Sequence, residues 1–241
     1  MVRASSPSRM VRCGRISPMP KKVDRRARRE EIVRTYLKIA ARDGMEAATT
    51  RALAAELGVA VGSLWHYFSG FDEVLSQAFE MIFQRTDARI ARRVDDSAGL
   101  DALRAMLEEV LPIGGVPRDE AYVVVSFWGR VAANPSVGSL QVAVEHQWRR
   151  QMAGYLREAV DAEELHPEAP VEDIADALLY LVTASQFERV LGTRLGQEAR
   201  LWQIVRHHLA PWMTEQAAQQ WQPPSSWGDA PEGEASGAPE A

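Results

Sequence analysis

The chain has 241 residues, of which 46% are hydrophobic and 25% are charged, and its formal net charge is -5 at pH 7. This composition is typical of a globular protein with one large domain or two smaller ones. The single cysteine, Cys13, rules out a disulfide framework and a cysteine-based metal site, so we expect a reducing, cytoplasmic location. No apolar run approaches the roughly 20 residues that a membrane-spanning helix needs.

The two ends of the chain differ strongly in charge. Residues 1–30 contain ten arginines and lysines against two acids, whereas residues 217–241 contain acids and no base. A basic end suits contact with a polyanion. The alternative for residues 1–22 is a disordered basic leader, in which Met10 or Met19 is the true start. We expect disorder in the tail 217–241 because its Pro, Gly, Ser and Glu residues cannot bury enough apolar surface to offset the ordering entropy.

The pattern between the two ends is helical, and no residues alternate long enough to predict a sheet, so we expect an all-α fold. Helices are predicted over residues 28–44, 50–58, 61–68 and 69–94. Gly44 follows the first helix, where a left-handed residue is favoured. Thr50 is expected to cap the second helix, and Asp72 and Glu73 suit the dipole of the fourth.

The second and third predicted helices, with a glycine-containing turn between them, form a helix-turn-helix pattern. In this arrangement the start of the first helix faces a DNA phosphate, to which the hydroxyls of Thr49 and Thr50 donate hydrogen bonds. The second helix enters the major groove. The small residues Gly62 and Ser63 allow its backbone to approach the DNA closely.

The predicted helix over residues 61–68 also contains apolar residues that would hold it against the rest of the domain. Leu64 and Phe68 lie four positions apart and are expected to be buried against the other helices. Trp65, His66 and Tyr67 are then left to face outward or sideways. Local packing is the alternative role for Trp65 and Tyr67.

Residues 32–75 resemble the DNA-binding domain of the tetracycline-repressor (TetR) family. The resemblance is carried, in one register, by the apolar pattern of the first helix, the glycine after it, and the segments "TTRALA", "LGV" and "GSLWHYF". It implies a homodimeric transcriptional regulator, usually a repressor, whose helical C-terminal domain binds a small ligand that lowers DNA affinity. We therefore expect a DNA-binding domain over 23–86 and a ligand-binding and dimerisation domain over 87–216.

The family's DNA contacts can be transferred to positions of this sequence. The residues expected to bind DNA are Thr49, Thr50, Arg51, Val61, Gly62, Ser63, Trp65, His66 and Tyr67. Three positions depart from the family pattern: Trp65 replaces the usual tyrosine, Ala60 replaces a serine or threonine cap, and Phe71 replaces a lysine that touches phosphate. We therefore expect phosphate affinity to depend more on the arginines Arg25, Arg26, Arg28 and Arg29.

Five further helices are expected, separated by segments rich in glycine and proline. They cover residues 98–110, 118–133, 136–163, 170–192 and 197–215. The last two carry an apolar stripe that the resemblance assigns to a four-helix dimer interface, comprising Leu178, Leu181, Leu201, Val205 and Leu209. The alternative is a stripe that packs within one chain.

Aromatic residues gather on the helices between positions 122 and 155. A candidate pocket for the small-molecule effector comprises Tyr122, Phe127, Trp128, Glu145, Trp148 and Tyr155. Tryptophan faces beside a carboxylate suit a cationic ligand. The alternative is ordinary core packing.

Sequence motifs for catalysis are missing. The chain contains no HExxH, no GxxxxGK and no GxSxG, and its five histidines lack the spacing of metal ligands, so we expect no enzyme activity, cofactor or metal. The function that the pattern favours is a DNA-binding, ligand-responsive repressor that reads an inverted repeat as a homodimer. The alternative is a helical scaffold of the same fold that has lost operator binding.

Overall fold

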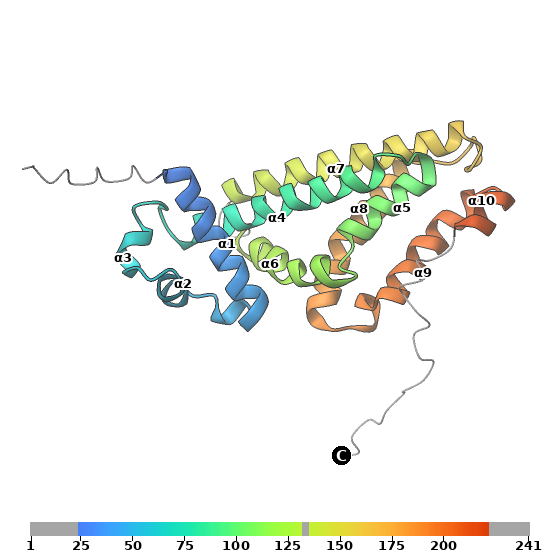
Figure 1. The fold of residues 1–241 in the computed structure, drawn as a ribbon. Helices are drawn as coiled ribbons and strands as arrows, with labels where there is room; N and C mark the ends of the chain where they lie inside the picture. Colours follow the sequence, from blue (N-terminus) through green and yellow to red (C-terminus); the bar gives the residue numbers. More distant parts are fainter. Residues whose placement is uncertain (1–23, 132–134, 222–241) are drawn as a thin grey trace, which may run out of the picture.

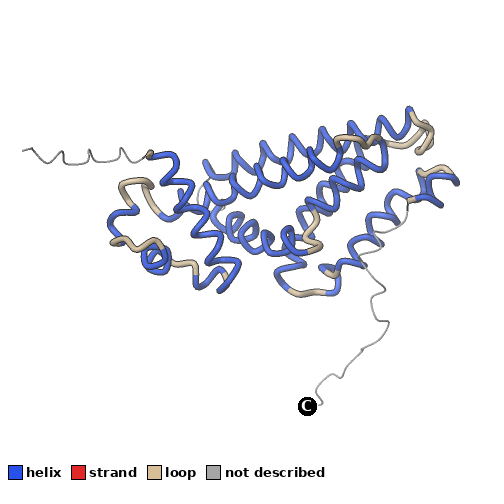
Figure 2. Tube along the Cα trace, viewed as in Figure 1, coloured by secondary structure: helices blue, strands red, loops and turns tan. Residues whose placement is uncertain are grey.

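The computed structural model describes residues 24–131 and 135–221, so the basic leader 1–22 and the tail beyond 221 lie outside the described residues. The helices are α1 Arg25–Asp43, α2 Thr50–Glu56, α3 Val61–Leu64, α4 Phe71–Val94, α5 Gly99–Val110, α6 Gly115–Val131, α7 Pro135–Asp161, α8 Val171–Leu191, α9 Glu198–Leu209 and α10 Glu215–Gln220. Figures 1 and 2 show that the described chain is built from helices and loops without a strand, which confirms the all-α prediction.

The ends of the first helices differ in detail from the prediction. Asp24 caps α1, because its carboxylate accepts hydrogen bonds from the amides of the first turn. Gly44 has the positive φ that was expected, at 87°, but its ψ of 164° is not left-handed helical. The cap of α2 is Thr49, whose hydroxyl accepts from the Ala52 amide at 3.2 Å, and the prediction of Thr50 as the cap was wrong.

One apolar cluster joins α1, α2, α3 and the first half of α4. Leu64 and Phe68 are buried in it, as the spacing predicted. Phe71 also packs here, with its ring edge-on to Tyr36 and the centroids 5.7 Å apart. The cluster continues into α6, where the ring of Phe127 stacks on Phe79 at 4.0 Å.

A second apolar cluster lies among α5, α7, α8 and α9. Its buried members include four residues of the predicted dimer stripe, Leu178, Leu201, Val205 and Leu209, and the fifth, Leu181, is partly buried against it. For the four buried residues the assignment to a dimer interface was wrong, because their side chains already fill the interior of one chain.

The C-terminal part of the described chain also departs from the prediction. The helix expected over 197–215 ends at Leu209, and α10 follows after a short 3-10 turn. Trp221 is buried, with its ring 4.5 Å from that of Trp202, and its indole N–H donates to the Leu100 carbonyl at 3.2 Å. Order therefore extends through the first residues of the predicted disordered tail, because a tryptophan there reaches the core.

Two long helices, α4 and α7, run side by side from the first cluster to the second (Figure 1). The side-chain amide of Gln147 on α7 donates to Asp87 on α4 at 2.8 Å. The domain boundary proposed at residue 86 falls inside α4, whose Ile82 packs in the first cluster and whose Ile90 packs in the second. A rigid helix thus connects the two regions without a linker.

Candidate DNA interface and ligand pocket

The predicted recognition helix is short. Regular helix α3 covers only Val61–Leu64, and the prediction of a helix to residue 68 was too long. The amides of Trp65, His66 and Tyr67 reach back only three residues along the chain. We call residues 61–68 the recognition segment.

The side chains predicted to read DNA are largely accessible. Val61 and Trp65 are 39% and 40% exposed, whereas Tyr67 is partly buried. Among the nine residues predicted to bind DNA, six are exposed, namely Thr49, Arg51, Val61, Gly62, Trp65 and His66, and three are partly exposed, namely Thr50, Ser63 and Tyr67. The Thr49 hydroxyl accepts a bond within its own helix and keeps its proton for an outside acceptor.

The arginines of α1 have partners within the chain. Arg26 and Arg28 pair with acids one turn ahead on the same helix. Arg25 donates to the carbonyl of His66 at 3.4 Å. Arg29 donates to the Tyr67 carbonyl and is only 24% exposed, so its expected role as a phosphate contact does not fit its surroundings.

Glu73, in the first turn of α4, completes this junction. It accepts from Arg29 at 2.6 Å and from the amide and hydroxyl of Ser69 at 2.6 and 2.9 Å. The Ser69 amide and Arg29 hold the pKa of Glu73 below its ordinary value. The sequence indicated only a favourable helix dipole at Glu73, because no local pattern links it to an arginine 44 residues earlier.

A cavity lies inside the helical bundle, lined by side chains of α4, α5, α6, α7 and α8. The volume that a water molecule can occupy is about 50 Å³. The total empty space between the lining atoms, including the open mouth, is about 570 Å³. Ligand sites commonly measure about 300–1,000 Å³. A drug-sized ligand would therefore need the lining side chains to move.

Three of the six predicted pocket residues line this cavity, namely Trp128, Glu145 and Trp148. Phe127 does not, because it is fully buried against Phe79. Tyr122 is 45% exposed on the surface, and Tyr155 packs against the second cluster. Tyr122 and Phe127 lie on other faces of α6 than Trp128, whereas Tyr155 lies on the same face of α7 as Trp148 but two turns farther along.

The polar groups of the cavity form a chain along one wall. The Trp128 indole N–H donates to Gln141 at 2.7 Å, and the Gln141 amide donates to Glu145 at 3.0 Å. Among the described residues, no cation pairs with Glu145. The indole N–H of Trp148 is buried, with no hydrogen-bond partner in the described part of the chain.

Two further acids, which no sequence pattern indicated, also line the cavity. Glu109 and Glu120 line the cavity and both accept from Arg89 of α4, at 2.8 and 2.9 Å. Burial raises the pKa of Glu120 above its ordinary value, although Arg89 opposes the shift. This partly buried network connects α4, α5 and α6 beside the cavity.

Residues 24–131 and 135–221 hold no cluster of three potential metal ligands. None of the helices in these two ranges is long and apolar enough to span a membrane.

Known proteins match both halves of the chain. Residues 32–78 match the family model described as bacterial regulatory proteins, tetR family, and residues 99–212 match the model of the C-terminal part of BetI-type transcriptional repressors. The chain belongs to the TetR family of transcriptional regulators. The N-terminal match falls on α1 to α4 and the C-terminal match on α5 to α9.

Named TetR-family relatives cover parts of this chain. The regulator PksA of Bacillus subtilis is 38% identical over 72 residues, 30% of this chain, and the regulator BetI of Stenotrophomonas maltophilia is 28% identical over 127 residues, 52% of this chain. The chain spans 35% and 65% of the lengths of these two curated relatives.

Solved structures share the fold over most of the chain. A transcriptional regulator from Rhodococcus sp. Rha1 has a TM-score of 0.63 at 23% identity, covering 76% of this chain and 95% of its own. A regulator from Saccharomonospora viridis, solved in complex with choline, has a TM-score of 0.66 at 20% identity, with 77% and 95% covered.

Proposed function

We propose that this TetR-family protein is a ligand-responsive repressor that binds an inverted-repeat operator as a homodimer. The observation that carries the proposal is the exposed recognition segment, with Trp65 and His66 accessible on a domain of the TetR type. Base edges are read by such side chains, whereas hydroxyls at the start of α2 and on Tyr67 suit phosphates. One recognition segment covers too few base pairs for useful selectivity, so two copies are needed.

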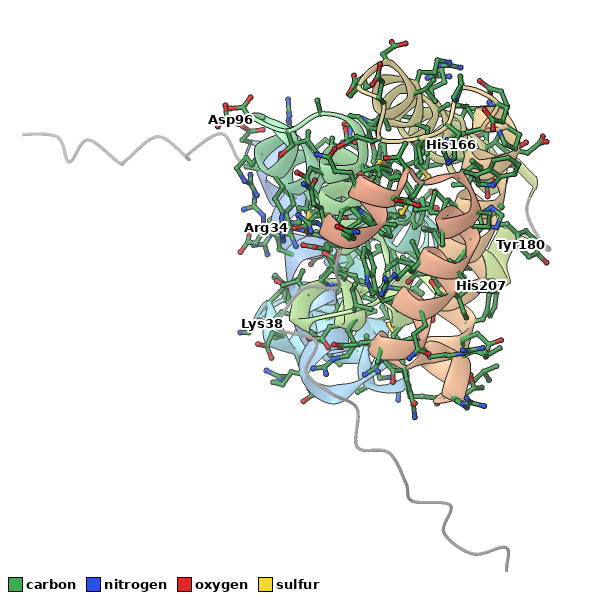
Figure 3. All side chains as sticks on the ribbon, turned by 90° about the vertical axis from the view of Figure 1, so that its right-hand side faces the viewer. Arg34, Lys38, Asp96, His166, Tyr180 and His207 are labelled. Carbon is green, nitrogen blue, oxygen red and sulfur yellow. The ribbon has the colours of Figure 1, made fainter. Side chains whose placement is uncertain are left out.

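The dimer surface that we propose is the outer face of α8. Three of its apolar side chains are exposed, with Tyr180 at 78%, Leu191 at 71% and Phe187 at 43%. They recur at helical spacing and are therefore on one face. Figure 3 places Tyr180 on the same side as His207 of α9, away from α1. Apolar area of this kind is typical of a protein interface.

The effector that best fits the cavity is a small organic cation that also carries a hydrogen-bond acceptor. The carboxylate of Glu145 lies beside aromatic side chains of the cavity and pairs with no cation among the described residues. The buried indole N–H of Trp148 has no hydrogen-bond partner there, so a ligand acceptor would satisfy it. The choline complex of the Saccharomonospora viridis relative supports a cation of this class. The sequence identity of 20% to that relative makes this an argument from fold and from the residues present here.

Release of DNA would proceed through α4. This helix begins beside the recognition segment, and its residues Phe79 and Phe83 line the cavity. A ligand changes DNA affinity only as far as it binds the two conformations differently. A coupling of roughly 2 kcal/mol would weaken operator binding about thirtyfold.

The test has two stages. Wild-type protein first selects duplexes from a random library, and the proposal requires an inverted repeat bound far more tightly than a scrambled duplex. Choline and larger quaternary ammonium compounds are then titrated while tryptophan fluorescence and DNA binding are followed. Failure to select any sequence would favour the scaffold alternative.

Variants of the cavity test its assignment. Glu145→Gln should weaken the response to the cation at least roughly tenfold and leave DNA binding without ligand unchanged. Glu168→Gln, which removes an exposed acid far along the chain, is the matched control. Equal responses of these two variants would place the ligand elsewhere.

A further inference from the structure

The recognition segment is held in place by side chains beyond its fourth residue. After Leu64 the backbone leaves the regular helix, and the carbonyls of His66 and Tyr67 accept from Arg25 and Arg29. The Arg25–His66 contact is exposed, so water can replace it, whereas the Tyr67 carbonyl is part-buried and would lose free energy without a partner. The orientation of the segment therefore depends on residues of α1.

Arg29 is fixed by three contacts at once. One terminal nitrogen donates to the Tyr67 carbonyl, and the other donates to Glu73 at 2.6 Å. The guanidinium carbon also lies 4.3 Å from the centre of the Phe68 ring. These contacts use the planar fork of arginine, which lysine cannot reproduce.

Glu73 fixes the same unit from the other side. Its two oxygens accept from Arg29 and from Ser69, the residue that follows the recognition segment. Because Glu73 belongs to α4, the pair joins three elements: α1, the recognition segment and α4. We call Arg29 and Glu73 the clasp.

We propose that the clasp positions the recognition segment for base readout, and that Arg29 is a positioning residue rather than a phosphate ligand. The inference rests on the proposed DNA-binding function. To reach a phosphate, Arg29 would have to give up both the Tyr67 carbonyl and Glu73. The partly buried Tyr67 carbonyl would then lose its hydrogen bond, and Glu73 would keep only Ser69 as a partner.

The sign of one substitution separates positioning from electrostatics. Glu73→Gln removes a negative charge close to the DNA-binding surface, so electrostatics alone predicts tighter binding to any duplex. The clasp predicts weaker binding to the selected operator, because the neutral amide of this variant cannot hold Arg29 and the Ser69 amide as strongly as the carboxylate does.

The experiment compares wild type, Glu73→Gln, Arg29→Met and the double variant. Each binds the duplex selected by the wild-type protein, and a scrambled duplex of equal length, over a range of salt concentrations. We expect the affinity of both single variants for the selected duplex to fall roughly tenfold or more, as for a lost charge-assisted hydrogen bond. Their affinity for the scrambled duplex should change little. The affinity of the double variant for the selected duplex should be no lower than that of the weaker-binding single variant.

The controls address charge and folding. Arg28→Met removes the same charge from the same helix, where Arg28 pairs only with Glu31 among the described residues. A phosphate contact by Arg29 would lower the salt slope by about 0.9 in Arg29→Met, whereas the clasp leaves the slope unchanged. If Arg29→Met fails to fold by circular dichroism, Arg29→Lys takes its place.

The outcomes are distinct. A wild-type protein that selects no duplex overturns the proposed function itself. If the wild type selects an operator, then Glu73→Gln binding that operator as tightly as wild type, or a reduced salt slope in the Arg29 variant, overturns the clasp. Weaker and less selective binding by both variants at an unchanged slope supports it.

Discussion

At the scale of single residues, the departures from the TetR pattern have structural reasons. Phe71 stands where a lysine touches phosphate in the family, and here its ring packs edge-on to Tyr36. Ala60 leaves the start of α3 without a side-chain cap. The short helix is instead held by buried Leu64 and Phe68 and by the arginines of α1.

The recognition segment makes a prediction with two separable effects. Tyr67→Phe removes only a hydroxyl, so it should weaken binding to all duplexes alike, by about 0.5–1.5 kcal/mol. His66→Ala removes an exposed side chain suited to base edges, so it should change which operator is preferred. Selection from a random library measures preference, and titration with a scrambled duplex measures the uniform loss. A changed preference in Tyr67→Phe would contradict these roles.

The sequence could identify residues whose role depends on local spacing. Leu64 and Phe68 follow from an interval of four, and Trp148 and Glu145 follow from aromatic clustering beside an acid. Glu109 and Glu120 could not be found in this way, because their common partner Arg89 lies 20 and 31 residues away along the chain. Contacts between helices depend on packing, which no local pattern specifies.

At the scale of elements, the apolar stripe of α8 and α9 illustrates the same limit. A stripe shows that a helix buries one face, but both a core and a dimer interface satisfy that requirement. The structure places Leu178 and Val205 inside the chain. The same reasoning failed for the tail, where one buried tryptophan, Trp221, extends order beyond the composition boundary.

The Arg89 network makes a prediction that depends on pH. Arg89→Met removes the shared partner of two partly buried acids, so it should lower the free energy of unfolding by about 1–3 kcal/mol near neutral pH. Burial already raises the pKa of Glu120 above the ordinary 4.5, and the loss of Arg89 raises it further. The loss of stability is absent below the pKa that Glu120 has in the unfolded chain. It grows as the pH rises from there through the higher pKa that Glu120 has in the folded chain.

Urea unfolding at about pH 5 and about pH 7 measures this effect, which should be smaller at the lower pH. The matched control is Arg93→Met, because Arg93 is 50% exposed while it pairs with Glu108 and Glu109. Its loss should cost less than about 1 kcal/mol. A cost for Arg89→Met that is the same at both pH values would show that Glu120 does not carry the penalty.

At the scale of the whole molecule, two sets of apolar residues on α8 should behave differently. Tyr180→Asp combined with Leu191→Asp places charge on the exposed face, so the dimer should dissociate while the fold persists. Leu178→Ala leaves a cavity in the core and should lower the free energy of unfolding by about 2–5 kcal/mol without changing the mass. Light scattering and thermal unfolding separate the two results, and an unchanged dimer mass in the double variant would move the interface elsewhere.

The proposed dimer face also adjoins the ligand cavity. Phe187, on the exposed face of α8, has its ring 5.2 Å from that of Trp128, which lines the cavity. A ligand that moves Trp128 therefore reaches the proposed contact between subunits as well as α4. Both routes would change the distance between two recognition segments.

Under the proposed function, the small cavity volume of about 50 Å³ would also set how much effector a cell must accumulate before transcription begins. If the ligand-accepting form is rarely populated, the apparent dissociation constant rises in inverse proportion to that population. The switching threshold is then a property of the closed bundle as much as of the ligand contacts. Trimming one lining side chain, such as Phe83, would enlarge the cavity and should make the proposed regulator more sensitive to its ligand without altering the recognition segment. Evolution could therefore match this protein to different metabolite levels through its core packing alone.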